Sequence, residues 1–207
     1  MEALLLDWSG TLVDDFTPTL YASNEVFKEY GLAEWSANEF RRKFYLPYPD
    51  FYKEVLPEVP LEDLEVIFRK TFVECPRPVE MLEHSYDFLV WAKSAGIQLI
   101  ILTSMDSDNF ESQAREFGVW EMFDGIYSGV LNKCDTIPEI VSKHKLNPSK
   151  TAFVGDMEHD LDAAHSVGIQ SVAVLTGYDH VDSLVAREPN LILNHIGKLR
   201  QVIEACQ

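Results

Sequence analysis

The sequence predicts an α/β protein with a doubly wound parallel sheet and a small α-helical domain inserted after the first strand. Two observations support this fold class. From residue 79 onward, short runs of continuous apolar residues alternate with stretches of helical periodicity, as buried parallel strands and their covering helices do. The stretch 15–79 is helical in pattern and holds no convincing strand. We therefore expect residues 1–14 and 80–207 to form an α/β core, and residues 15–79 to form a helical domain.

The elements of the first part follow from local signals. Residues 3–7, ALLLD, are typical of a short buried strand, and this strand ends in a carboxylate. Turn-forming residues at Gly31, at Pro47 and in the segment 57–60 then divide the chain into helices. The helices expected here span 17–30, 36–45, 49–56 and 60–74.

The second part of the chain alternates between helices and strands. Gly96 and Gly168 each follow a helical stretch, where a left-handed turn favours glycine. The expected helices span 81–94, 109–117, 136–144 and 161–167, with a last one from Ile196. The expected strands are 97–103, a short apolar piece at 124–130, 151–156, 171–175 and 191–194.

Composition excludes several classes of partner. The chain has 34 acidic and 17 basic residues and a net charge of -17, so its surface repels nucleic acid and anionic membranes. A small polyanion is still compatible, because a metal ion and a few lysines can reverse the sign inside one pocket. The three cysteines are scattered, and no basic segment precedes the first strand. We therefore expect reduced thiols and a cytoplasmic protein without a secretory signal.

Polar residues gather where the predicted strands end. In open parallel sheets, ligands bind outside the carboxyl ends of the strands. Three aspartates at one edge suit Mg²⁺, a lysine and a hydroxyl can hold phosphate oxygens, and an aspartate can attack phosphorus. Taken alone, the aspartates are better explained as turn or helix-cap residues, and Lys133 and Thr103 alone carry almost no signal, so the ordered set carries the prediction. Its members are Asp7, Thr103 with Ser104, Lys133, and Asp156 with Asp160.

The same residues lie in four motifs that resemble those of the haloacid dehalogenase superfamily. DWSGTLVDD resembles the family's first motif, D-x-D-G-T-L/V, and IILTS resembles its second, a strand that ends in Ser or Thr. NKCDTIPEI resembles the lysine motif, and VGDMEHDLDAA resembles the motif G-D-x-x-x-D. The resemblance covers the whole chain and implies a Rossmann-like core. The helical stretch 15–79 resembles the cap of the phosphoglycolate phosphatase and β-phosphoglucomutase subgroup. A Mg²⁺-dependent phosphatase acting on a small phosphorylated metabolite is the function that this resemblance implies.

The resemblance also implies roles for individual residues. Asp7 is the expected nucleophile, and Lys133 restrains it and binds the transferring phosphoryl group together with Thr103 and Ser104. Mg²⁺ is expected to bind Asp7, Asp156, the backbone carbonyl of Ser9 and, often through water, Asp160.

Ser9 departs from the motif, because phosphatases of the family carry a second aspartate there as general acid and base. A hydroxyl is too weak an acid or base for that role, so we expect slow hydrolysis of alkyl phosphates and faster hydrolysis of activated esters. Three interpretations stay open: a slow phosphatase, a protein that binds phosphorylated ligands with little turnover, and a relative of phosphonoacetaldehyde hydrolase. The last of these needs a lysine in the cap, where Lys43 and Lys53 are available.

The cap shows a second departure. Tyr45 stands in RRKFYLP where the subgroup usually has glycine near the mouth of the site. It either packs within the cap or contacts substrate at a narrowed entrance. The neighbouring cluster of Arg41, Arg42 and Lys43 is either a solvated helix face or a recognition site for a remote acidic group of the substrate.

Overall fold

A six-stranded parallel sheet lies at the centre of the computed structural model, which describes residues 1–206. The first strand of the chain is flanked by strands that come much later, so that Leu4 pairs with both Leu99 and Ala152. The connections run to one side of this strand and then to the other, as in a doubly wound sheet. In spatial order the strands are β5 (Gly125–Tyr127), β4 (Gln98–Leu102), β1 (Ala3–Leu6), β6 (Thr151–Gly155), β7 (Gln170–Val174) and β8 (Leu191–Leu193).

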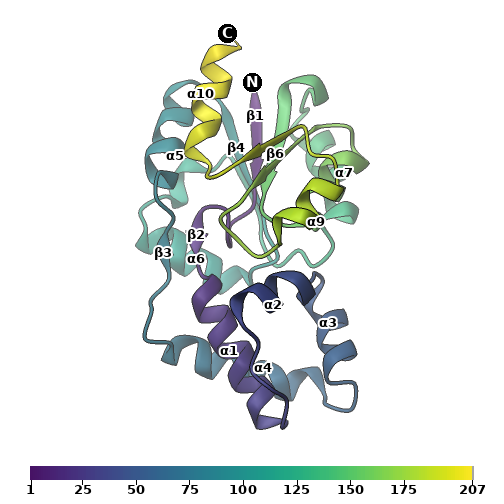
Figure 1. Cartoon of the computed structure of the whole chain (residues 1–207). Coiled ribbons are helices and arrows are strands. Elements are labelled where there is room, and N and C mark those ends of the chain that lie inside the picture. The colour runs from purple at the N-terminus through teal and green to yellow at the C-terminus, as the bar shows by residue number, and fades with distance from the viewer. Residues whose placement is uncertain (207) are drawn as a thin grey trace.

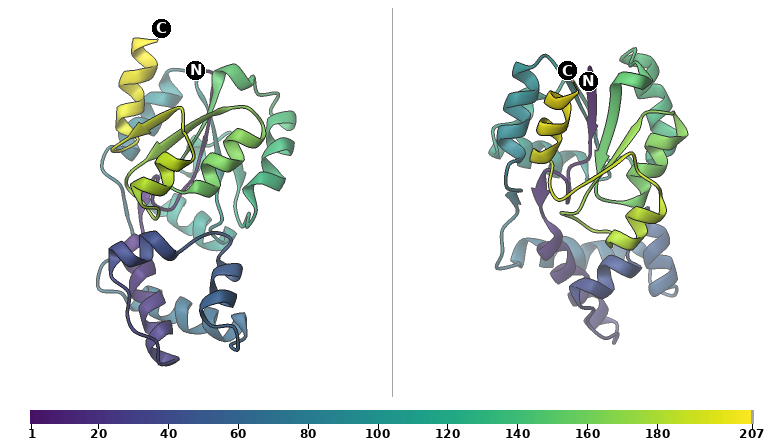
Figure 2. Two further views of the ribbon diagram at one scale, coloured as in Figure 1. Left: turned by 45° about the vertical axis from the view of Figure 1, so that its right-hand side comes forward. Right: turned by 45° about the horizontal axis from the view of Figure 1, so that its top comes forward.

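Helices cover both faces of the sheet, which explains why its strands are continuously apolar. Leu4 and Leu6 pack on one face with residues of α5 (Ser85–Ser94), α6 (Ser107–Glu116) and α10 (Gly197–Ala205). Ala3 and Leu5 pack on the other face with α7 (Lys133–Lys143) and α8 (Glu158–Ser166). The two layers are visible in Figure 2, with α5 and α10 on one side of β1 and α7 and α8 on the other. The predicted fold class is confirmed.

Four helices form a separate layer at one end of the sheet (Figure 1). They are α1 (Phe16–Glu29), α2 (Ala37–Lys43), α3 (Tyr48–Val55) and α4 (Leu61–Glu74). We call residues 16–74 the helical segment. It has an apolar cluster of its own, centred on Phe27, Phe51 and Leu64, which are almost completely buried. The four helices expected from the sequence are found, each within two residues of its predicted bounds.

A short antiparallel pair joins the helical segment to the core, and it was not predicted. It is formed by β2 (Val13–Asp14) and β3 (Glu80–Met81). The helix predicted from residue 81 begins instead at Ser85, after His84 in a left-handed conformation with φ of 73°. Two-residue strands are too short to show a period of two, so periodicity could not reveal them.

Helix starts also differ from the prediction, in a way that matters for the site. Helix α7 begins at Lys133 and α8 at Glu158, each about one turn earlier than the sequence indicated. Their first turns are polar, and Asn132 caps α7 by accepting a hydrogen bond from the Cys134 backbone. Because polar first turns carry no apolar periodicity, the prediction began too late. The short helix α9 (Val181–Ala186) was missed as well.

The helical segment is held against the core by α2. The Arg41 guanidinium lies 3.8 Å from the centre of the Phe16 ring, and its Nε donates to the Gly177 carbonyl at 2.8 Å. Arg42 hydrogen-bonds to His180 at 2.9 Å. Two of the three basic residues of this cluster therefore bind the loop after β7. Within residues 1–206, no helix is both long and apolar enough to span a membrane.

Candidate active site

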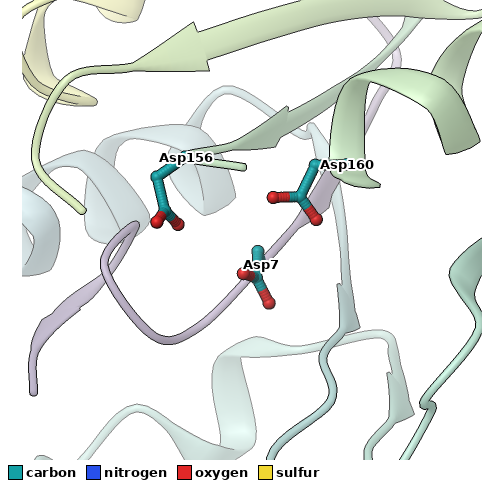
Figure 3. A group of neighbouring side chains, drawn as sticks. All are labelled: Asp7, Asp156 and Asp160. Atoms are coloured by element: carbon teal, nitrogen blue, oxygen red, sulfur yellow. The ribbon is translucent and has the colours of Figure 1, made fainter. Parts of the chain in front are cut away.

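Three buried aspartates converge at the carboxyl end of the sheet. Asp7 follows β1, Asp156 follows the neighbouring strand β6, and Asp160 lies in the first turn of α8. Each has a carboxylate oxygen within 4.8 Å of the others, and the three side chains lie close together at this end of the sheet (Figure 3). The Asp7 backbone N–H donates to the Val154 carbonyl at 3.0 Å, which fixes the end of β1 beside β6.

Lys133 supplies the positive charge of this cluster. Its side chain is fully buried, and Nζ lies 2.6 Å from Asp160 Oδ1 and 2.9 Å from Asp7 Oδ1. Burial alone would lower the pKa of Lys133, but the charges of Asp160 and Asp7 outweigh it and raise the pKa above its ordinary value. The lysine therefore stays charged. Its place in the first turn of α7 explains how a residue distant in sequence reaches both aspartates.

The Asp156 carboxylate is held by two hydrogen bonds, and a glycine lets the backbone come close enough for one of them. Its two carboxylate oxygens accept hydrogen bonds from the Thr11 hydroxyl at 2.7 Å and the Tyr178 backbone N–H at 2.8 Å. A Cβ atom on Gly177 would overlap the Asp156 carboxylate, so the backbone can approach the carboxylate only because residue 177 is glycine. The Asp156 side chain thus has a single defined position.

The charges of the cluster do not balance. Three aspartates face one lysine, and the nearby imidazole of His159 adds no charge, because burial and the charge of Lys133 lower its pKa to about 4. Burial, together with the other carboxylates, raises the pKa of Asp7 and raises that of Asp156 further. The raised pKa values mean that the surroundings of these buried carboxylates do not fully compensate the ionised forms for the loss of water. A divalent cation among these oxygens would supply the missing charge, and oxygen donors suit Mg²⁺.

A cavity of about 710 Å³ separates this cluster from the helical segment. Asp7, Ser9, Thr103 and Ser104 line its core end. Its other walls are mostly aromatic and aliphatic side chains, largely from the helical segment, and include Phe44, Tyr48, Tyr52, Leu64, Phe68 and Phe72. The aspartate cluster therefore meets a cavity large enough for a small molecule.

The two predicted hydroxyl groups at the end of β4 differ in their hydrogen bonds. Thr103 is buried and its Oγ1 accepts from the Met105 backbone at 3.2 Å, which leaves its own O–H free to donate. The Ser104 hydroxyl donates to the Val130 carbonyl at 2.9 Å. Thr103 is thus the better placed donor for a ligand in the cavity.

Other candidates from the sequence lie elsewhere. Tyr45 is not among the cavity-lining residues; its hydroxyl donates to Glu54 at 2.9 Å and its ring packs edge-on against Phe51. The expected substrate contact by Tyr45 therefore has no support in the structure, and packing within the helical segment accounts for it. The basic cluster Arg41–Lys43 does not line the cavity either.

Two polar residues beside Ser9 escaped the sequence analysis. Asp15 is 2% exposed and lines the cavity. It accepts a hydrogen bond from the Tyr178 hydroxyl at 2.8 Å. Burial raises the pKa of Asp15 to about 6, although the hydrogen bond from Tyr178 acts against the rise. The doublet Asp14–Asp15 was the sequence signal that could have revealed Asp15. Tyr178 had no such signal, because it lies in a loop without any periodic pattern.

Comparison with known proteins agrees with this geometry. The family model of haloacid dehalogenase-like hydrolases matches residues 4–174. A phosphoglycolate phosphatase of Synechococcus elongatus is 26% identical, over 98% of this chain and 97% of that protein. A phosphoglycolate phosphatase of Aquifex aeolicus is 24% identical over 89% and 90% of the two chains.

Solved structures point the same way. A haloacid dehalogenase-like hydrolase from Streptococcus pneumoniae superposes with a TM-score of 0.83 at 25% identity, covering 100% of this chain and 99% of that one. Because the family model spans most of the sequence, the chain belongs to the haloacid dehalogenase-like hydrolases.

Proposed function

We propose that this chain is a Mg²⁺-dependent phosphatase that transfers the phosphoryl group of a small phosphorylated metabolite to Asp7 and then hydrolyses the aspartyl-phosphate. One observation carries the proposal. A buried set of three aspartates and one lysine, short of positive charge, opens through Asp7 onto the cavity beneath the helical segment. Such a set suits a ligand that brings both phosphate oxygens and a divalent cation.

Each residue has a chemical task in this proposal. A carboxylate oxygen of Asp7 attacks phosphorus, and the ester oxygen leaves with a proton; water then breaks the acyl phosphate and restores Asp7. Lys133 keeps Asp7 in place, and the free O–H of Thr103 donates to a phosphate oxygen. The cation would be held by Asp7, Asp156 and the backbone carbonyl of Ser9, with Asp160 behind them. When bound, it would neutralise the charge of the phosphoryl group.

The residues that line the cavity, together with the relatives, favour a particular class of substrate. The relatives named phosphoglycolate phosphatase favour a small phosphate monoester, and residues 15–79 would act as a cap over it. Because the walls that the helical segment contributes are mostly apolar, we expect the organic part of the substrate to contact aromatic and aliphatic groups there. A protein of this charge, with free thiols at Cys75, Cys134 and Cys206, suits a small-molecule substrate in the cytoplasm, without nucleic acid or a membrane as partner.

The structure weakens one alternative. A phosphonoacetaldehyde hydrolase would need a lysine at the cavity to form an imine. None of the described cavity-lining residues is a lysine: Lys43 lies over the Trp35 ring, and Lys53 is exposed on α3. A phosphoryl-binding protein with little turnover is the remaining rival.

A phosphatase screen distinguishes the two. Purified protein is incubated with phosphoglycolate, sugar phosphates and aryl phosphates, with Mg²⁺ and with EDTA, and released phosphate is measured. We expect Mg²⁺-dependent turnover of at least one ester. Tight binding of phosphate esters without any release of phosphate would favour the binding protein instead.

Mg²⁺ is expected to stabilise the protein, because it binds the folded cluster and not the unfolded chain. A ligand at 100 times its dissociation constant contributes about 2.7 kcal/mol, which a thermal unfolding curve detects readily. Protons compete for carboxylates whose pKa values are raised, as they are for Asp7 and Asp156. The stabilisation by Mg²⁺ should therefore grow as the pH rises.

Asp156→Asn should remove this response, whereas Asp108→Asn, an exposed carboxylate on α6, should leave it intact. An equal Mg²⁺ response in wild type and Asp156→Asn would place the cation elsewhere.

A further inference from the structure

Gln113 lines the cavity of the candidate active site, and its side-chain oxygen already has a partner. The indole N–H of Trp8, the residue that follows Asp7, donates to Gln113 Oε1 at 2.8 Å. An indole nitrogen can only donate, so the end of the amide that faces Trp8 must be the oxygen. The orientation of the Gln113 amide is therefore set by a completely buried ring.

The amide nitrogen of Gln113 has no corresponding partner. Within residues 1–206, no protein group accepts a hydrogen bond from Gln113 Nε2. The side chain is half-buried and lines the cavity, while its oxygen is turned onto the indole. The two N–H donors of Nε2 are therefore the polar groups of this side chain that remain for a ligand.

The wall that α6 contributes to the cavity is polar but uncharged. Three residues of this helix line the cavity, at the spacing of one helix face, and they are Asn109, Ser112 and Gln113. The helix also has four charged residues, none of which lines the cavity: Asp108, Glu111, Arg115 and Glu116. A ligand therefore meets only neutral hydrogen-bonding side chains of α6.

The cavity offers no free positive side chain for a second acidic group of a substrate. Among its lining residues in the described part of the chain, Arg69 is the only lysine or arginine, and its guanidinium is 2.8 Å from Glu65. The remaining charged lining residues are acidic, namely Asp7, Asp15 and Asp106. An organic part without charge suits these surroundings better than one that carries a carboxylate.

We infer that Gln113 binds the substrate and selects phosphate esters with an uncharged organic part, by donating from Nε2 to a carbonyl or hydroxyl oxygen of that part. This inference rests on the proposed phosphatase function and names the class of ester on which the protein acts. The phosphoryl group lies at Asp7, the carbonyl or hydroxyl oxygen at Gln113, and the apolar remainder against the helical segment. Because Trp8 directly follows Asp7, one short stretch of chain positions both the nucleophile and the amide.

Gln113→Glu separates substrate recognition from structure. One carboxylate oxygen can still accept from Trp8, whereas the other replaces the N–H donors and repels a carbonyl oxygen. The matched ligands are hydroxyacetone phosphate and propyl phosphate, which differ only in a carbonyl group. We expect the wild type to prefer hydroxyacetone phosphate, and this preference to fall about five- to a hundredfold in the variant. Phosphoethanolamine, whose ammonium group suits a carboxylate, should become a better substrate.

Two further variants control for structural effects. Gln201→Glu makes the same change at an exposed position of α10, outside the cavity, and should leave the preference unchanged. Gln113→Leu leaves the buried indole N–H of Trp8 without an acceptor, so it should unfold at a lower temperature than the wild type. Gln113→Glu should unfold close to the wild-type temperature, because it keeps the acceptor.

The measurements are kcat/KM for each ester with Mg²⁺, and calorimetric binding of each ester to Asp7→Asn with either Gln or Glu at position 113. Equal binding of hydroxyacetone phosphate and propyl phosphate to Asp7→Asn, or a preference that Gln113→Glu leaves intact, would overturn the role of Gln113 even in an active phosphatase. A higher wild-type kcat/KM for phosphoglycolate than for hydroxyacetone phosphate would overturn the selection for an uncharged organic part. The expected binding preference in a protein that releases no phosphate from any ester would support Gln113 as the binding residue and overturn the proposed phosphatase function.

Discussion

Replacing Asp7 with asparagine should reduce phosphatase activity to the background of the assay. The amide has nearly the shape of the carboxylate but cannot act as the nucleophile, and removal of a covalent nucleophile in a serine protease costs on the order of a million-fold in kcat. Asp87→Asn, which changes an exposed carboxylate on α5, is the matched control. The measurement is phosphate release in the presence of Mg²⁺.

The fold of Asp7→Asn should survive. Burial raises the pKa of Asp7, so the folded protein disfavours its charged form and tolerates a neutral amide. Lys133 keeps its contact with Asp160 at 2.6 Å. We expect the variant to unfold at or above the wild-type temperature when no Mg²⁺ is present. Wild-type phosphate release by a folded Asp7→Asn would show that the reaction has no aspartyl-phosphate at this residue.

Lys133→Met should give the largest loss of stability. Lys133 is completely buried between Asp7 and Asp160, and breaking a buried ion pair by removing one partner typically costs 3–5 kcal/mol, because the remaining charge is left uncompensated. For a chain of this length, that corresponds to a fall of roughly 6–20 °C in the midpoint of thermal unfolding. Lys53→Met, on the exposed face of α3, should change the midpoint little.

Mg²⁺ gives this prediction a second readout. A divalent cation would replace part of the positive charge that Lys133 supplied, so it should stabilise Lys133→Met by more than it stabilises the wild type. A variant with the wild-type midpoint in EDTA would show that the carboxylates do not depend on the lysine for their charge balance.

The sequence could predict which residues form buried strands and which site residues follow directly after a strand. Leu4, Leu5 and Leu6 are buried on both faces of the sheet, and their continuous apolar run indicated this. Asp7 and Asp156 follow directly from neighbouring strands, so their convergence was predictable. Lys133 and Asp160 lie in the polar first turns of helices. The sequence placed them near the same edge because they lie in or beside the loops that follow strands, and the family resemblance supplied their roles.

Other features of the site depend on the direction in which a side chain points, and contacts between segments that are distant in sequence determine that direction. The sequence analysis made no prediction for Asp15, whose side chain is held at the cavity by a hydrogen bond from Tyr178, far along the chain. Tyr45 faces Glu54 and Phe51 within the helical segment, although its neighbours Phe44 and Leu46 line the cavity. No pattern of spacing distinguishes these neighbours, so the sequence could not separate the packing residue from the cavity wall.

The central position of β1 has a consequence for how the protein is made. During synthesis, β1 has no sheet partner until β4 has been made, and its second partner, β6, follows much later. Pairing between segments so distant in sequence slows folding, because a long stretch of chain must be ordered before the contacts form. Until then, the apolar residues 3–6 are exposed to other chains and to chaperones. Asp156 and Asp160 are also synthesised after β4, so a nascent chain contains the whole helical segment long before it contains the aspartate cluster.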